Sequence, residues 1–134
     1  MPQIIPYLTV NDASAAGEFY KRAFDATETE RHVAEDGKRL MHLALRIAGG
    51  TLMLADDFPE YNGGKASSPR ALGGTPVTLT LECANVDQAW EMAVKAGATV
   101  KMPLADQFWG DRYGQLEDPF GHVWALYTPG AKAK

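Results

Sequence analysis

Residues that could bind a small molecule are concentrated near the C-terminus. The segment 108–113, FWGDRY in one-letter code, combines aromatic rings with charge where a loop is expected to enter a strand. A tryptophan, an arginine and a tyrosine at the mouth of a cavity suit a flat or anionic small molecule. For Trp109 a structural interpretation stays open, in which it fills a dimer interface or covers one end of the sheet. Trp109, Arg112 and Tyr113 are therefore candidate ligand-binding residues, whereas Asp111 is expected to be structural.

His42 and Tyr7 are expected on a second face that could bind a ligand. Leu43 and Leu45 alternate with their neighbours, so His42 points to the side of the strand opposite these leucines. An imidazole can carry a proton near neutral pH, which makes His42 a candidate general base or ligand donor. The alternative is a histidine that only hydrogen-bonds a neighbour. Tyr7 shares its face with Thr9 and is expected to form an aromatic wall of the same cavity.

Two carboxylates complete the candidate site. Asp56 ends a strand, where it either caps nearby backbone or reaches over the rim of the cavity. Glu82 is expected to face inward, and its alternative role is a salt bridge to Arg46, because buried charges must be paired. The predicted ligand-binding residues are Tyr7, His42, Asp56, Glu82, Trp109, Arg112 and Tyr113.

These residues must be positioned by short strands and two amphipathic helices. One helix is predicted over 13–24 after the cap residues Asn11 and Asp12, and a second follows Asn85 or Asp87 and ends at Gly97. Strands are predicted at 4–10, 27–34, 42–47, 51–55, 77–83 and 99–102, followed by a loop at 103–109 and a closing hairpin whose turn is 118–121.

The order of these elements repeats along the chain. Each half reads as strand, helix and three strands, and 8–12 in the first half corresponds to 81–85 in the second. The predicted organisation is one α+β domain over 1–134, with repeats at approximately 1–57 and 76–130. The glycine-rich segment 58–75 is predicted to be a flexible linker. The alternative is an α+β sandwich without internal symmetry.

Composition excludes several classes of protein. The chain has 134 residues and a net charge of −4, which disfavours nucleic acid and anionic membranes as partners. No apolar run approaches the roughly 20 residues that span a bilayer, and the N-terminus lacks the features of a signal peptide. Cys83 is the single cysteine, so no internal disulfide can form. A cytoplasmic location is therefore expected.

Several motifs together resemble one known family, the vicinal oxygen chelate superfamily of glyoxalases, bleomycin resistance proteins and dioxygenases, and within it the PhnB-like branch. The resemblance implies two βαβββ modules whose strands form a U-shaped mixed sheet, with the helices on its convex face. It also implies a homodimer. The motifs that carry it are 5–12, 18–20, 41–42, 49–56, 85–89, 108–114 and 118–122.

The resemblance also implies where a catalytic metal would be bound. The four positions that carry His or Glu in metal-dependent members correspond here to Ile5, Met53, Thr78 and Ala125. None of these side chains is a suitable ligand for a divalent ion. No metal and no other cofactor is therefore predicted. The alternative is a relocated divalent metal held by His42, Asp56 and Glu82.

Three functions remain open on these grounds. The first is a metal-free homodimer that binds a small molecule, as drug-sequestering members of the superfamily do. The second is a lyase, isomerase or transferase of the same superfamily that uses a relocated metal, or His42 as general base. The third is a structural or regulatory dimer without a ligand.

Overall fold

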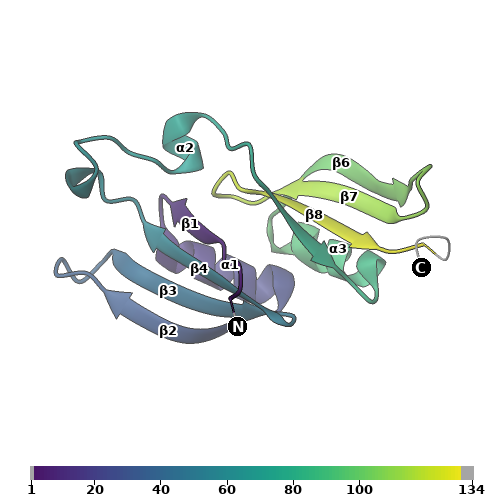
Figure 1. The fold of residues 1–134 in the computed structure, drawn as a ribbon, viewed down its shortest axis with the longest axis horizontal. Coiled ribbons are helices and arrows are strands. Elements are labelled where there is room, and N and C mark those ends of the chain that lie inside the picture. The colour runs from purple at the N-terminus through teal and green to yellow at the C-terminus, as the bar shows by residue number, and fades with distance from the viewer. Residues whose placement is uncertain (1, 131–134) are drawn as a thin grey trace.

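The computed structural model describes residues 2–130 and consists of two βαβββ modules that lie side by side (Figure 1). This confirms the α+β class and the internal repeat. Module 1 contains β1 (Tyr7–Val10), α1 (Ala13–Phe24), β2 (Thr27–Val33), β3 (Leu40–Ile47) and β4 (Gly50–Asp56). Module 2 contains β5 (Thr78–Glu82), α3 (Val86–Ala96), β6 (Thr99–Asp106), β7 (Arg112–Glu117) and β8 (Val123–Thr128).

The strands expected in one U-shaped sheet are divided between two mixed sheets, one in each module. Their orders are β1-β4-β3-β2 and β5-β8-β7-β6. In both sheets the first strand pairs in parallel with the last, and the other pairs are antiparallel. The parallel pair requires a crossover, which α1 and α3 provide.

Both helices begin and end where their capping residues lie. The Asp12 carboxylate accepts from the amide of Ala15, and the Asn85 side chain accepts from the amide of Gln88. Gly97 follows α3 with a positive φ of 125°, a conformation that favours glycine. The predicted helix bounds are thus confirmed.

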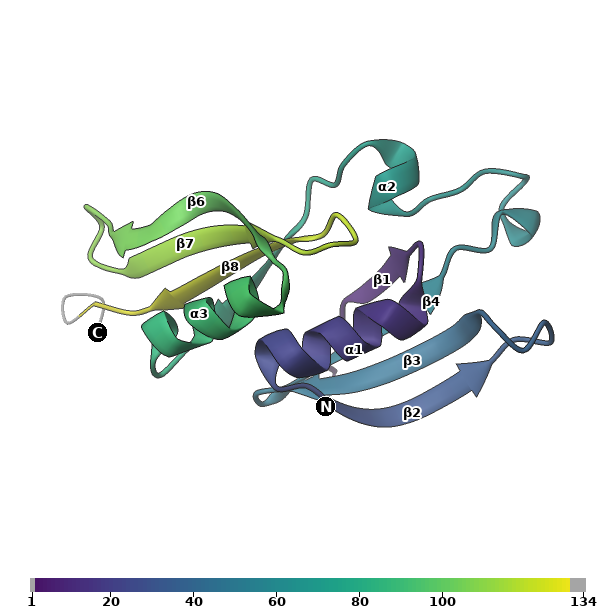
Figure 2. The same cartoon turned by 180° about the vertical axis from the view of Figure 1, so that it is seen from behind.

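The two helices cover the same side of the molecule and leave the other side of both sheets open (Figure 2). On β4, Leu52 and Leu54 are buried toward α1, whereas Thr51 and Met53 are only partly covered. On β5, Thr78 and Thr80 are exposed on the open side. We call this uncovered side the open face, and the alternation that predicted it is confirmed.

Polar contacts join the two modules beneath the helices. The Tyr20 hydroxyl on α1 donates to the carboxylate of Asp118 in the β7–β8 turn, at 2.5 Å. Asp118 is 2% exposed and also accepts from Trp124 Nε1. His122 Nε2 lies 3.0 Å from the carbonyl oxygen of Thr9 on β1. The β7–β8 turn therefore fixes the position of module 2 against module 1, through Asp118 and His122.

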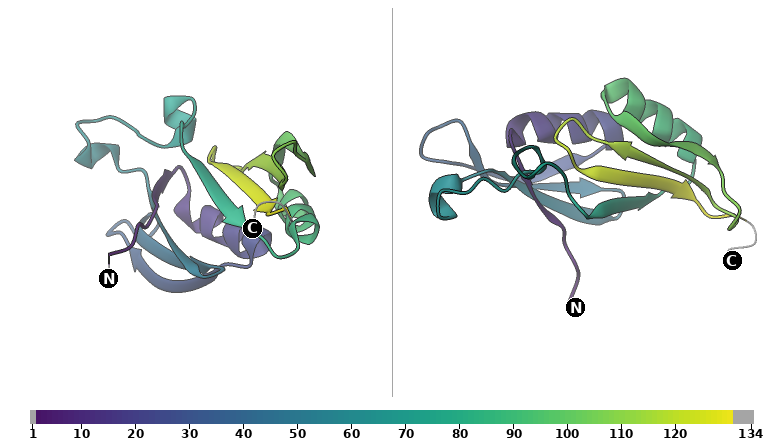
Figure 3. Two further views of the ribbon diagram at one scale, coloured as in Figure 1. Left: turned by 45° about the vertical axis from the view of Figure 1, so that its right-hand side comes forward. Right: turned by 90° about the horizontal axis from the view of Figure 1, so that it is seen from above.

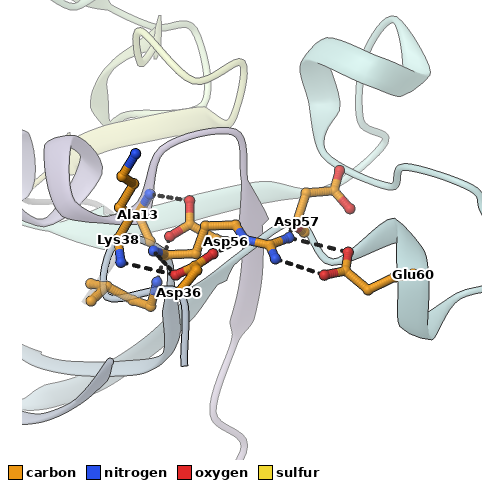
Figure 4. A network of polar contacts seen from close by, with 8 residues as sticks. Ala13, Asp36, Lys38, Asp56, Asp57 and Glu60 are labelled. Carbon is orange, nitrogen blue, oxygen red and sulfur yellow. Dashed lines mark hydrogen bonds and ion pairs between the residues drawn. The ribbon is translucent and has the colours of Figure 1, made fainter. Parts of the chain in front are cut away.

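The linker has more structure than the sequence indicated. It contains a 3-10 turn at Pro59–Tyr61 and the short helix α2 (Pro69–Leu72). The Asp57 carboxylate accepts from the amides of Ser67 and Ser68. Arg39 pairs with Asp36 and with Glu60, which ties the linker to the β2–β3 hairpin (Figure 4).

Three strand boundaries differ clearly from the prediction: β1 begins at Tyr7 instead of residue 4, β3 begins at Leu40 instead of residue 42, and β6 is longer than predicted. The segment 103–106 was expected to begin a loop, but β6 continues to Asp106 despite Pro103. Since β6 is the outer strand of its sheet, the missing amide hydrogen of Pro103 need not interrupt the ladder. The register with β7 is irregular between Met102 and Ala105. Among residues 2–130, no helix has the length and apolar character needed to cross a membrane.

Candidate functional site

Tyr7, His42 and Glu30 form a hydrogen-bonded chain on the open face of module 1. The Tyr7 hydroxyl lies 3.0 Å from Nδ1 of His42, and Nε2 of His42 lies 2.9 Å from Oε1 of Glu30. The Tyr7 residue is 52% exposed, and its hydroxyl also lies 3.3 Å from the carbonyl oxygen of Met41. Partial burial raises the pKa of the Tyr7 hydroxyl, which keeps the tyrosine protonated at neutral pH.

The three residues come from three strands, and the strand pairing places them on one face of the sheet. Ala44 pairs with both Glu30 on β2 and Met53 on β4, and Met53 pairs with Tyr7 on β1. Sheet pairing thus assembles residues that are distant in the sequence.

Glu30 was not identified from the sequence, and neither was its neighbour His32. His32 pairs with His42 across the β2–β3 ladder, and its Nε2 lies 3.6 Å from Oε1 of Glu30. The turn signal at Asp36-Gly37 predicted this hairpin, but the register between β2 and β3 shifts between Glu28 and Glu30. That irregularity cannot be counted from the sequence, so the position of Glu30 required the structure.

A hollow of about 370 Å³ lies beside Tyr7, where the two modules and the linker meet. A volume of this size is within the range of small-molecule sites, roughly 300–1,000 Å³. Its lining is mostly apolar and comes from β1, the α2 segment, the start of β5 and the β7–β8 turn. The residues around it include Pro6, Tyr7, Thr9, Pro69, Leu72, Val77, Leu79 and His122.

Asp56 does not lie on the open face. It is 8% exposed, and its carboxylate accepts from the amides of Ala13 at 2.8 Å and Leu40 at 2.7 Å (Figure 4). Both oxygens therefore hold backbone at the start of α1 and β3. The position contradicts a role at the rim of a cavity and supports the capping alternative, because the carboxylate faces the helix side.

Glu82 lies on the exposed end of β5, as its alternation predicted, but its partner differs from the expected one. The Tyr127 hydroxyl donates to Glu82 at 2.9 Å, and this hydrogen bond raises the pKa of the Tyr127 hydroxyl. Arg46 is exposed on the open face of module 1 and forms no ion pair within residues 2–130. The alternative role of Glu82, a salt bridge to Arg46, is therefore not formed within residues 2–130.

Arg112 lies on the helix side of module 2, where it lines a hollow of about 350 Å³ that is separate from the hollow beside Tyr7. Its guanidinium contacts both carboxylate oxygens of Asp87, with an ion pair of 2.8 Å, and Asp106 at 3.3 Å. The hydrogen bond from Arg112 lowers the pKa of Asp87. Asp87 is in the first turn of α3, so the arginine anchors that helix to the β6–β7 hairpin.

Trp109 and Tyr113 lie at the tip and start of the same hairpin. Trp109 is 45% exposed, donates from Nε1 to Asp111 and packs edge to face against Tyr113, with ring centroids 5.7 Å apart. The Tyr113 hydroxyl accepts from Gln115. The structure places this group at the far end of module 2 from Tyr7 and His42 (Figure 1), so within one chain the predicted residues form two separate sites.

The residues present do not fit the metal that the fold family implies. The corresponding positions hold Ile5, Met53, Thr78 and Ala125, which offer no carboxylate or imidazole. The relocated set is also separated, because Asp56 faces the helix side while His42 and Glu82 lie on different modules. Within residues 2–130 no three His, Cys, Asp or Glu side chains are grouped to hold a metal ion.

Similar proteins share this architecture over almost the whole chain. The chain is 53% identical over 128 residues to the uncharacterized protein Mb0911c of Mycobacterium bovis, covering 96% of this chain and 84% of that one. TioX from Micromonospora sp. ML1 superposes with a TM-score of 0.74 at 25% identity, covering 96% and 99% of the two chains. The PhnB protein from Bacillus cereus gives a TM-score of 0.67 at 18% identity, covering 95% and 99%.

The family model of the Glyoxalase/Bleomycin resistance protein/Dioxygenase superfamily matches residues 3–126. This match covers both modules, the linker and the Tyr7–His42–Glu30 chain. The TM-score of 0.74 to TioX shows that a solved structure shares the arrangement of the two modules. The protein therefore belongs to the Glyoxalase/Bleomycin resistance protein/Dioxygenase superfamily.

Proposed function

We propose that this protein is a PhnB-like member of the superfamily that binds a small molecule without a metal. The observation that carries this proposal is the apolar hollow beside Tyr7, whose hydroxyl group belongs to a polar chain on the same face. Apolar walls with a few placed polar groups are typical of small-molecule sites. The similarity to the PhnB protein from Bacillus cereus, at 18% identity, is a similarity of fold, and it is the support for assigning the protein to the PhnB-like branch.

The proposed assembly is a homodimer in which a second copy covers the open faces. Both sheets leave this face uncovered in one chain (Figure 2). The N-terminal residues project from the same side (Figure 3, right), and Ile4 is 98% exposed. Covering such apolar groups with a second copy would remove them from water. Trp109 and Phe108, exposed at the β6–β7 tip, would contribute to the same contact or rest against the partner's ligand.

The binding function is tested by thermal melts of the purified protein against a library of aromatic and anionic small molecules. A ligand that binds only the folded state should raise the melting temperature in a concentration-dependent way. Leu79→Glu, which places a charge in the hollow, should abolish the rise. Tyr61→Phe changes an exposed ring outside the hollow and should leave it intact. A library without any stabilising compound would contradict the binding function.

The homodimer is tested separately by light scattering. The expected mass is twice 14.6 kDa. Ile4→Glu should weaken the dimer, because it places a charge on the projecting segment. A mass of one chain at all concentrations would contradict the assembly.

A second candidate is an enzyme of the same superfamily with His42 as general base. It is favoured by the contact between Nε2 of His42 and Glu30, since a carboxylate behind an imidazole stabilises the protonated ring. Replacing His42 with Gln should then abolish turnover of a compound found in the library screen while leaving the fold intact. Retained turnover would remove His42 from the mechanism.

The remaining proposals concern partners and location. An acidic chain with a net charge of −4 is expected to bind no nucleic acid and no membrane, and to reside in the cytoplasm. A fluorescence titration with duplex DNA at low salt should show no saturable binding. Tight binding at that salt concentration would contradict this expectation.

A further inference from the structure

We propose that Tyr7, His42 and Glu30 form a proton-accepting chain that binds a weakly acidic hydroxyl group of the ligand, a phenol or an enol, as its anion. This inference rests on the proposed binding function and specifies the chemical class of the ligand. The observation behind it is the order of the hydrogen bonds, in which the Tyr7 hydroxyl contacts the His42 imidazole and the imidazole contacts the Glu30 carboxylate.

The direction of the hydrogen bonds follows from the carboxylate. Ionised Glu30 can only accept, so the Nε2 of His42 that faces it carries the proton. In the neutral ring, Nδ1 is then an acceptor. The Tyr7 hydroxyl lies 3.0 Å from this nitrogen and 3.3 Å from the carbonyl oxygen of Met41, and we assign its proton to the nearer Nδ1. The Tyr7 oxygen then keeps lone pairs that can accept a hydrogen bond from a ligand.

A ligand with an acidic hydroxyl completes the chain by proton transfer. The ligand O–H bond breaks and its proton passes to the oxygen of Tyr7, while the original tyrosine proton moves to Nδ1 of His42. The ligand keeps the electron pair as an oxyanion, Tyr7 ends as a neutral hydroxyl that donates to it, and His42 becomes an imidazolium beside Glu30. No other reactant is consumed, and the site itself gains the charge that balances the bound anion.

The charges around the chain favour this outcome. Glu30 on β2 stabilises the imidazolium, and Arg46 on β3 adds a positive charge on the same face that has no ion-pair partner within residues 2–130. His32 on β2 is the other titratable side chain that β2 presents on the open face, and its Nε2 lies 3.6 Å from Glu30. Glu28 and Arg31 of β2 and Asp56 of β4 lie on the helix side. On β4, Met53 and Ala55 cannot titrate. After the proton transfer, the open face of module 1 therefore presents the His42 imidazolium and the Arg46 guanidinium to the anion, with Glu30 as the carboxylate beside them.

The test compares two probes of the same shape, 4-nitrophenol and 4-nitroanisole. The methyl ether keeps the aromatic ring and the nitro group but has no acidic hydrogen. We expect wild-type protein to bind the phenol about tenfold more tightly than the ether, as one hydrogen bond to a charged group would provide. The bound phenol should also show the visible absorption of its anion at a pH where the free probe is mostly protonated.

Variants assign the effect to the chain. Tyr7→Phe, His42→Gln and Glu30→Gln should each reduce the ratio of the phenol affinity to the ether affinity from about ten to near one, and each should remove the visible band. His32→Gln is the matched histidine control and should keep both. Equal affinity of the wild type for the two probes would overturn the proton-accepting chain and leave the binding function intact.

A measurement without ligand provides an independent check. Nitrogen-15 NMR of the histidine rings at pH 8 should show His42 with its hydrogen on Nε2, and Glu30→Gln should shift that resonance. A hydrogen on Nδ1 would reverse the direction of the chain and overturn the proposal. Failure of both probes to bind at millimolar concentration would overturn it as well, whereas the library screen decides the binding function by itself.

Discussion

In each module one glycine lets the helix lie close to the sheet, but the glycine is on the helix in module 1 and on the sheet in module 2. Gly17 in α1 lies under Leu43 of β3, and a Cβ atom on the glycine would meet Leu43 Cδ2 at 2.7 Å. In module 2 the helix carries the large residue: Trp90 of α3 covers Gly114 of β7, where an added Cβ would meet its ring at 2.6 Å. Both glycines permit close contact between helix and sheet, so the repeat preserves summed volume rather than sequence.

The same comparison holds for the strand ends that support the helices. In module 1 the buried carboxylate of Asp56 accepts two backbone amides, from α1 and β3. At the corresponding end of β8, Thr128 donates one hydrogen bond to the carbonyl oxygen of Cys83. Module 1 thus depends on one buried charge where module 2 uses a neutral hydroxyl.

The open faces differ most. By sheet register, Tyr7, His42 and Glu30 correspond in module 2 to Thr80, Tyr113 and Met102. The second set contains no imidazole and no carboxylate, so it cannot form the chain. The repeat therefore conserves the scaffold, while the chemistry of the open face is specific to each module.

The largest loss of unfolding free energy is expected at the β7–β8 turn of module 2, where Asp118 is a buried carboxylate. The corresponding 47–50 turn of module 1 has no carboxylate. Asp118→Ala removes the acceptor of Tyr20, Trp124 and the amides of Phe120 and His122. Because these donors are left without a partner, we expect a loss of about 4 kcal/mol in unfolding free energy, measured by urea denaturation.

Tyr20→Phe is a milder substitution than Asp118→Ala, since it removes only the hydrogen bond from Tyr20 to Asp118. It should cost about 1 kcal/mol. If Asp118→Ala were no more costly than Tyr20→Phe, the turn would not fix the modules through this carboxylate.

The strand-end comparison predicts the next largest effect. Asp56→Asn places an amide group opposite a backbone donor and should cost about 2 kcal/mol of unfolding free energy. Thr128→Val keeps the shape and removes one hydroxyl, so it should cost less than about 1 kcal/mol. Equal losses in urea denaturation would show that the two strand ends are energetically equivalent.

Adding one methyl group tests the exchange of large and small residues. Gly114→Ala should cost about 2 kcal/mol, because the new Cβ meets the Trp90 ring and the backbone of Leu104 at 2.9 Å. Gly17→Ala should cost less, since it meets the end of a flexible leucine and gains helix propensity of about 1 kcal/mol. A larger loss for Gly17→Ala would reverse this order.

A smaller, pH-dependent effect is expected from Glu28, which binds Lys21 of α1 and Arg31 of β2. The hydrogen bond from Arg31 lowers the pKa of Glu28 to about 2. A lowered pKa in the folded state stabilises the protein above the ordinary carboxyl range, and that contribution is lost as pH falls toward 2. The pair is partly solvated, so Glu28→Gln should cost about 1 kcal/mol at pH 7.

The difference between wild type and Glu28→Gln should disappear in urea denaturation at pH 2. Glu35→Gln, an exposed substitution in the neighbouring hairpin, serves as the control and should change little at either pH. A difference that persists at pH 2 would point to packing instead of charge.

No effect is expected from metal ions, because neither module supplies a ligand at the four family positions. Melting temperatures of chelator-treated protein should stay unchanged with Ni²⁺, Zn²⁺, Mn²⁺, Fe²⁺ or Co²⁺. A selective rise that disappears in His42→Gln would reveal a relocated site on module 1.

Much of the fold could be predicted because its signals are local. Asp12 and Asn85 mark the helix starts, and the alternation around Leu52 and Leu54 assigned the faces of β4. The extent of β6 could not be predicted, because whether Pro103 ends a strand depends on its place at the sheet edge. The linker helices were missed for a related reason: Asp57 and Arg39 bind them from outside the linker.

In the candidate site, too, some features follow from local signals in the sequence and others depend on the tertiary structure. The sequence by itself determined that Tyr7 and His42 share a face and that no metal ligand stands at the family positions, since both follow from residue type and strand alternation. Only the tertiary structure decided that Glu30 completes their chain and that Asp56 and Arg112 face the helices. Those contacts depend on strand register and on charged partners from other elements, which no local pattern encodes.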